Sequence, residues 1–206
     1  LKYDRYDNLF AQVSRGEGPR DFVFPHADTP PTVVCIARAG SWEKLEAQAA
    51  AGIAVITHPD ERWARVDIKT VQLLPAALAK QAAKAAGAKE AWLVDRDGFV
   101  TEGASSNAWI VTADGALKTR SADSGILRGV TRSVVMEVVA REGFRLVEEP
   151  FTVAEARAAK EAFVTSASNF VMPVVKIDGR PVGTGKPGRL SLTLRRLFST
   201  AAEYAE

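Results

Sequence analysis

The sequence predicts an α+β fold built around a mixed or antiparallel sheet. Apolar runs with the composition of strands are intermixed with helical stretches, without the strict alternation of a doubly wound sheet. Two of the turns between these runs contain Asp97-Gly98 and Asp114-Gly115, and Asp-Gly pairs supply the positive backbone angles of tight hairpins. A chain of 206 residues, 47% hydrophobic and 25% charged, also has the length and composition to bury a sizeable core.

The predicted elements follow from the spacing of apolar residues and from the residues that bound them. Short β-rich runs between turn residues predict strands, and apolar residues spaced by three and four predict helices. In the helix predicted at 73–86, Leu74, Leu78 and Ala82 share a face and Gly87 follows as the stop. Strands are predicted at 10–14, 32–37, 52–56, 64–68, 90–94, 99–102, 107–111, 115–119, 161–165 and 173–177, and helices at 73–86, 130–142, 153–159 and 190–204.

A domain boundary is predicted near residue 40. The two strands before it flank residues 15–31, a stretch rich in Gly and Pro that is typical of a long, ordered and functional loop. Residues 38–42 then have the composition of a turn. We therefore expect residues 1–40 and residues 41–206 to belong to different domains.

Composition and charge exclude several classes of function. The net charge is +2 and is scattered along the chain, so nothing predicts nucleic-acid binding. Cys35 is the only cysteine, and His26 and His58 lack neighbours at metal-ligand spacing, so neither an internal disulfide nor a metal site is expected. No apolar stretch approaches the roughly 18 residues that cross a bilayer. The sequence therefore predicts a protein of the reducing cytoplasm without a membrane partner.

Two charged residues are candidates for chemistry. Lys69 ends the predicted strand before a helix, and a lysine in an apolar environment becomes a nucleophilic amine for carbonyl groups. Glu102 precedes a run of small polar residues at 103–107, where a carboxylate can neutralise the cation of a bound ring. Taken alone, a solvated surface lysine and an acid in a turn with local hydrogen bonds remain the alternatives.

Two further segments suit a bound anion. Gly129, Val130 and Thr131 begin the second helix, where unpaired N–H groups and the helix dipole favour a phosphate. Ordinary helix capping explains the same residues equally well. Ser166 and Ala167 lie in a run of small residues after a predicted strand, from which the same anion can be reached.

Four motifs occur in the order and spacing of the class IV aminotransferases, the fold-type IV pyridoxal phosphate enzymes, which the chain resembles over nearly its whole length. These motifs are Asp67-Ile68-Lys69-Thr70 and the ranges 98–107, 125–132 and 183–188. The resemblance implies a large cofactor-binding domain at 41–206 with mixed sheets and helices. Residues 1–40 would be the C-terminal part of a smaller α/β domain whose beginning is absent. It also implies a homodimer.

The resemblance implies roles for particular residues. Lys69 would form the Schiff base with pyridoxal 5′-phosphate and move the proton at the substrate Cα, and Glu102 would hold the protonated pyridine nitrogen. Further cofactor contacts are implied for Arg65, Ser105, Ser106, Leu127, Gly129, Val130, Thr131, Ser166 and Ala167.

The loop at 15–25 most resembles that of the D-amino acid aminotransferases. Arg20 would bind the substrate carboxylate, and Phe22 stands where those enzymes have a second polar residue, a histidine. The implied reaction moves an amino group from a D-amino acid to a 2-oxo acid. Branched-chain aminotransferase, 4-amino-4-deoxychorismate lyase and (R)-amine transaminase remain alternatives, because all would share Lys69 and Glu102. A non-catalytic fragment or scaffold is the alternative from another class.

Overall fold

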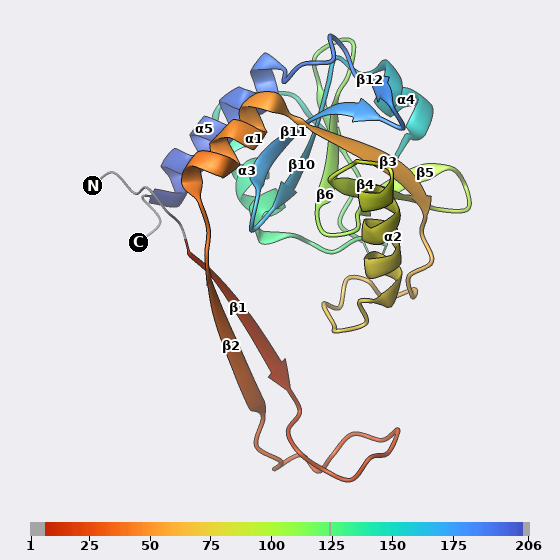
Figure 1. Cartoon of the computed structure of the whole chain (residues 1–206), viewed down its shortest axis with the longest axis vertical. Coiled ribbons are helices and arrows are strands. Elements are labelled where there is room, and N and C mark those ends of the chain that lie inside the picture. Colours follow the sequence, from red (N-terminus) through yellow and green to blue (C-terminus); the bar gives the residue numbers. More distant parts are fainter. Residues whose placement is uncertain (1–6, 124, 204–206) are drawn as a thin grey trace. The chain divides into compact units, whose positions relative to one another are not determined.

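The computed structural model describes residues 7–123 and 125–203, and it confirms the predicted α+β class (Figure 1). The chain divides into two compact units, residues 1–46 and residues 47–206. Within the described residues, no helix is long and apolar enough to cross a membrane. Tyr204, where we expected the last helix to end, lies outside the described residues.

The first unit is a long hairpin. Strands β1 (Asp7–Ser14) and β2 (Thr32–Ala39) pair antiparallel along their whole lengths, from Asp7 opposite Ala39 to Ser14 opposite Thr32. Residues 15–31 form the loop between them, as the Gly and Pro content predicts. Gly16 has a φ of +96°, and a Cβ there would lie 2.1 Å from the carbonyl oxygen of Pro30, so the loop needs glycine at this position.

Helix α1 (Trp42–Ala51) follows the hairpin and is absent from the elements that we predicted. The alanine-rich stretch is a good helix former, and Ser41 accepts a hydrogen bond from the backbone N–H of Lys44 (3.3 Å) as an N-cap does. Leu45 and Ala49, four residues apart, are both buried. The expectation of a turn at 38–42 was therefore wrong at both ends, because Arg38 and Ala39 belong to β2 and Trp42 is the first residue of α1.

The second unit contains a ten-stranded mixed sheet among the described residues, in the order β8-β7-β6-β10-β11-β3-β4-β5-β9 with β12 beside β11. The pairs β11–β3, β3–β4 and β7–β8 are parallel, and the other pairs are antiparallel. The strands are β3 (Ile53–Pro59), β4 (Glu90–Val94), β5 (Phe99–Gly103), β6 (Asn107–Val111), β7 (Leu117–Thr119), β8 (Leu146–Glu148), β9 (Phe151–Thr152), β10 (Glu161–Ser166), β11 (Phe170–Ile177) and β12 (Arg180–Pro181).

Helices pack on this sheet and form two apolar clusters. Helices α3 (Val130–Arg141) and α5 (Arg189–Glu203) lie together over the β6, β7, β10 and β11 strands (Figure 1). The rings of Trp109 and Phe163 stack in the core between them. Helix α2 (Leu74–Ala85) covers β4, where Ala79 and Ala83 meet Leu93. The short α4 (Val153–Ala158) starts at a capping box between Thr152 and Glu155.

One predicted strand does not form. Residues 64–68 belong to a loop between β3 and α2. The N–H of Ile68 donates to the carbonyl oxygen of Arg65 (3.1 Å), which closes a turn, and the Arg65 guanidinium binds the carboxylate of Asp67. Val66 and Ile68 alternate with polar residues, but this segment pairs with no strand, and Ile68 is exposed. Local hydrogen bonds therefore outweigh the strand pattern here, and Lys69 does not end a strand.

Candidate active site

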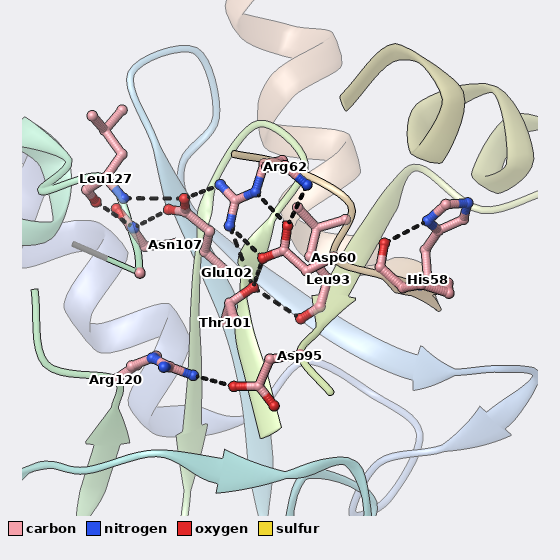
Figure 2. A network of polar contacts seen from close by, with 12 residues as sticks. His58, Asp60, Arg62, Leu93, Asp95, Thr101, Glu102, Asn107, Arg120 and Leu127 are labelled. Atoms are coloured by element: carbon pink, nitrogen blue, oxygen red, sulfur yellow. Dashed lines mark hydrogen bonds and ion pairs between the residues drawn. The ribbon is translucent and has the colours of Figure 1, made fainter. Parts of the chain in front are cut away.

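Glu102 lies at the centre of a buried polar network, which Figure 2 shows. The residue is 4% exposed, near the end of β5. Its Oε1 accepts hydrogen bonds from Nη1 of Arg62 and from the backbone N–H of Leu127 (3.0 Å), and its Oε2 accepts from Nδ2 of Asn107 (2.8 Å). Residues 62, 102, 107 and 127 thus meet at one point, although 65 positions separate the first from the last.

Arg62 joins Glu102 to a second carboxylate. Its Nε and Nη2 donate to the two oxygens of Asp60 (2.8 and 2.7 Å), which is a bidentate pair (Figure 2). Asp60 directly follows β3, and its N–H donates to the carbonyl oxygen of Val94 (2.8 Å) at the end of β4. The hydroxyl of Thr101 donates to Asp60 as well (2.7 Å). The ends of three neighbouring strands therefore fix the Arg62 side chain.

Burial and pairing act in opposite directions on the charges of this network. Burial raises the pKa of Glu102 above its ordinary value, and the charge and hydrogen bonds of Arg62 only partly offset this rise. Burial would also raise the pKa of Asp60, but its bonds to Arg62 and Thr101 hold that pKa below the ordinary value. Burial would lower the pKa of Arg62, but Asp60 and Glu102 hold it above the ordinary value. Arg62 is therefore a permanent cation beside Glu102.

Asn107 links Glu102 to the segment before α3. Its Nδ2 donates to Glu102 and to the carbonyl oxygen of Leu127 (2.9 Å). A Cβ on Gly129 would lie 2.3 Å from the Oδ1 of Asn107, so the close approach of these two segments requires glycine. Of the residues predicted for the cofactor, Glu102, Leu127 and Gly129 are thus brought together, and Asn107 is what connects them.

The N-terminus of α3 fits the predicted phosphate contact. Gly129 is the N-cap, in an extended conformation, and no side chain of residues 7–123 or 125–203 caps the helix. Val130 is 79% exposed and Thr131 is buried beside it. The N–H groups of the first turn of this 12-residue helix therefore remain available to an anion.

The turn between β10 and β11 lies at the same edge of the sheet. Strand β10 pairs with β6 so that Thr165 stands opposite Asn107. Ser166 follows Thr165, and its Oγ accepts from the N–H of Asn169 (3.2 Å), while Ala167 is exposed. Ser166 and Ala167 are therefore close in register to the Glu102 network, and their contact with the cofactor stays a prediction.

Ser105 and Ser106 face a different carboxylate. Both hydroxyls donate to Oε2 of Glu90, at 2.7 and 3.0 Å. We had expected the two serines to support the ring side of the cofactor. In this structure they hold the turn that follows Glu102, and any contact with the cofactor stays a prediction.

Lys69 lies in the loop between β3 and α2. It is exposed, and its side chain makes no hydrogen bond or ion pair with any described residue, so its amine is open to a carbonyl compound. Arg65, four residues earlier, forms an exposed bidentate pair with Asp67 at 2.8 Å. The bracing role that the resemblance implies for Arg65 stays a prediction.

Arg20 and Phe22 belong to the other compact unit. Both are exposed, and Phe22 is 95% exposed. The guanidinium of Arg15 lies over the ring of Phe24, at 4.7 Å from its centroid, and so helps to order this loop. Binding of a substrate carboxylate by Arg20 stays a prediction.

The sequence analysis missed Asp60, Arg62 and the role of Asn107. Asp60 directly follows an apolar strand, and a polar residue at the end of a strand was the signal that could have found it. Asn107 stands in one of the motifs quoted for the resemblance, without a role. No local pattern distinguishes Arg62, because its partner Glu102 is 40 positions away.

Comparison with known proteins places this mixed-sheet fold among the fold-type IV aminotransferases. A model of the amino-transferase class IV family matches residues 2–177. This chain belongs to that family, and membership confirms the predicted cofactor, pyridoxal 5′-phosphate.

Individual relatives agree with this assignment. D-alanine aminotransferase of Staphylococcus haemolyticus is 38% identical over 205 residues, which are 98% of this chain and 71% of that protein. D-alanine aminotransferase of Listeria monocytogenes serotype 4b is 40% identical over 192 residues, which are 93% of this chain and 65% of that protein. The chain thus spans about two thirds of the length of these relatives.

Solved structures show the same fold. A branched-chain amino acid aminotransferase of T.th. with pyridoxamine 5′-phosphate has a TM-score of 0.78 and 30% identity, over 95% of this chain and 64% of that one. The branched-chain amino acid aminotransferase of Escherichia coli also has a TM-score of 0.78, over 94% of this chain and 64% of that one, and its 22% identity supports the fold alone.

The described residues fit the cofactor. A carboxylate offers about four acceptor positions, and Glu102 fills two on Oε1 and one on Oε2 with protein donors. One buried position on Oε2 is left for the N–H of a protonated ring. The open amine of Lys69 and the uncapped start of α3 suit the carbonyl and the phosphate of pyridoxal phosphate, and these two contacts stay predictions.

Proposed function

We propose that this protein transfers the amino group of a D-amino acid, with D-alanine as the first candidate, to a 2-oxo acid. The observation that carries the proposal is the similarity to D-alanine aminotransferases at 36% to 40% identity over more than nine tenths of the chain. The free amine of Lys69 and the remaining acceptor position of Glu102 supply the chemistry that this reaction needs.

Each residue has a distinct task in this reaction. When bound, pyridoxal phosphate supplies an electron sink for the carbanion that forms at the substrate Cα. Lys69 would hold the cofactor covalently, and its amine would take the proton from the substrate Cα and return it. Glu102 keeps the ring nitrogen protonated, and Arg62 keeps Glu102 ionised beside it. The start of α3, with Val130 and Thr131, and the turn at Ser166 and Ala167 anchor the phosphate.

A donor panel tests the proposal. The purified protein with added pyridoxal phosphate is given D-alanine and 2-oxoglutarate, and pyruvate and chiral glutamate are measured. We expect D-alanine and D-glutamate to be donors and their L-isomers to be inactive. Turnover of L-leucine but not of D-alanine would overturn the proposal in favour of a branched-chain aminotransferase, the second candidate, which the solved structures at about 30% identity support.

The same panel separates the remaining alternatives. Turnover of an aliphatic (R)-amine, or release of pyruvate from aminodeoxychorismate, would assign the protein to one of the other two activities. Borohydride reduction separates the enzyme from a scaffold. If the protein is the proposed enzyme, reduction should leave a phosphopyridoxyl group on Lys69, which peptide mass spectrometry detects, whereas a scaffold would bind no cofactor covalently. The absence of this group would contradict the enzymatic function altogether.

We also propose a homodimer in the cytoplasm. Val71, Leu73, Leu74 and Leu78, at the start of α2 and just before it, are each more than half exposed in the single chain. A second copy of the chain would cover this apolar surface. Light scattering after size exclusion should give twice the mass of the chain, and Leu74→Lys should shift the protein toward the monomer.

A further inference from the structure

Glu90, outside the Glu102 network, is a buried carboxylate with three hydrogen bonds and one ion pair among the described residues. It starts β4 and is 3% exposed. Its Oε1 accepts from the N–H of Ala91 (2.8 Å) and faces Nζ of Lys80 (3.4 Å), and its Oε2 accepts from the hydroxyls of Ser105 and Ser106. A buried charge with this many partners holds the elements that supply them in fixed positions.

Glu90 thereby fastens the turn that joins Glu102 to Asn107. The N–H of Gly103 donates to the carbonyl oxygen of Ser106 (2.6 Å), which closes the turn. A Cβ on Gly103 would lie 2.2 Å from the Oγ of Ser106 and 3.3 Å from the Cδ of Glu90. The turn, its serines and the carboxylate therefore pack without spare room.

Strands β5 and β6 are joined by a turn but do not pair with each other, so they lack the backbone hydrogen bonds of a hairpin. In the order of the described sheet, β5 pairs with β4 and β9, and β6 pairs with β10 and β7. An isolated bridge between Gly103 and Ser106 is the backbone pairing that the structure records at the turn. The position of Glu102 relative to Asn107 is thus not set by a ladder of backbone hydrogen bonds.

We propose that Glu90 is a positioning residue of the active site. By accepting hydrogen bonds from the hydroxyls of Ser105 and Ser106, Glu90 fixes the end of β5 relative to the start of β6, which a ladder of backbone hydrogen bonds would otherwise do. It thereby holds Glu102 and Asn107 in the geometry that leaves one acceptor position for the ring. The relevance of Glu90 to catalysis rests on the proposed function, but its stabilisation of the turn at residues 103–106 can be tested without cofactor.

The central variant is Glu90→Gln, which keeps the shape of the side chain and replaces an acceptor oxygen by an amide donor. The matched control is Lys80→Met, which removes the half-exposed partner of Glu90 and leaves both serines in place. The double variant Ser105→Ala with Ser106→Ala breaks the same hydrogen bonds from the other side, in case Glu90→Gln does not fold.

The first readout is amide hydrogen exchange of the cofactor-free protein. We expect Glu90→Gln and the double serine variant to lower the protection of the Gly103 and Ala104 amides by about tenfold or more, while amides of β10 and β11 keep the protection of the parent. Lys80→Met should leave the protection of both regions unchanged, because Lys80 is half-exposed and contacts Oε1 of Glu90, whereas the two serines bind Oε2. Unchanged protection at the turn, or an equal loss over the whole sheet, would overturn the proposal.

The second readout is the cofactor. Glu90→Gln should weaken the binding of pyridoxal phosphate about tenfold and shift the visible absorption that reports protonation of the ring. Combining it with the serine variants should add no further loss, because all three act through the same bonds. Additive losses would mean that Glu90 and the serines act separately, which refutes the mechanism. A parent protein that binds no cofactor would refute the proposed function, while hydrogen exchange would still decide the role of Glu90.

Discussion

Replacing Arg62 by alanine should strongly destabilise the cofactor-free protein. The side chains of Arg62, Asp60 and Glu102 are 14%, 12% and 5% exposed, so the substitution leaves two carboxylates in a buried place without their shared cation. Removing one partner of a buried ion pair costs about 3 to 5 kcal/mol, because the remaining charge stays desolvated. For a chain of this size that is a drop of roughly 6 to 20 °C in Tm.

The cost should depend on pH, with a sign that follows from the pKa shifts. In the parent, the pKa of Asp60 is depressed, so the stability that it contributes is present above its ordinary pKa and is lost as the pH falls. Without Arg62, the pKa of Glu102 rises further, and a raised carboxylate pKa costs stability as the pH increases. Both effects make the penalty of Arg62→Ala larger near pH 7 than near pH 4.

Urea unfolding followed by tryptophan fluorescence measures this penalty, since Trp92 and Trp109 are fully buried in the second unit. Arg65→Ala is the matched control three residues further on, because the pair of Arg65 with Asp67 is exposed and should contribute nothing measurable. A loss below about 1 kcal/mol for Arg62→Ala, or a loss that does not change with pH, would refute the assignment of Arg62 as the buried counter-ion.

Three further substitutions test the reaction itself. Lys69→Ala should abolish transamination and borohydride labelling without changing the urea midpoint, since the side chain is exposed; near-parental turnover would contradict the role of Lys69. Glu102→Gln should slow proton removal from Cα by about 10²-fold or more in single-turnover measurements. Because burial raises the pKa of Glu102, the cofactor-free Gln variant should also gain stability relative to the parent as the pH rises above the ordinary value of 4.5, and a relative loss would contradict this. Arg20→Ala should lower kcat/KM for D-alanine by about ten- to a hundredfold and spare an (R)-amine, whereas equal losses would limit Arg20 to ordering its loop.

Local sequence signals predicted the elements in which an apolar run ends at a turn. The strands around Asp97-Gly98 form as expected, because the turn chemistry and the β-rich runs on its two sides agree there, and both strands are almost wholly buried. The β-rich run at 64–68 failed to form a strand, since a local turn formed there instead. Helix α1 was missed because alanine carries a weak periodic signal, so that only Ser41 marked its start.

The candidate site was predictable in its parts and not in its connections. The motifs around Lys69, Glu102 and Gly129 carry the family's chemistry and could be recognised one by one. The partners of Glu102 come from Arg62, 40 positions before it, and from Leu127, 25 positions after it. Such contacts depend on the order of strands in the sheet, which no local pattern contains. For the same reason Glu90 was read only as the first residue of a strand.

The balance of charges explains why the site suits a cationic ring. Two carboxylates, those of Asp60 and Glu102, share one guanidinium in a buried place, so one negative charge is left without a partner. The bidentate pair with Arg62 and the hydroxyl of Thr101 keep Asp60 ionised, so the unmatched charge falls on Glu102, whose pKa burial raises. A protonated ring nitrogen at the remaining acceptor position of Oε2 would neutralise that charge. Binding a protonated ring should therefore offset the cost of burying Glu102 in its ionised form, whereas a ring with an unprotonated nitrogen would leave that charge uncompensated.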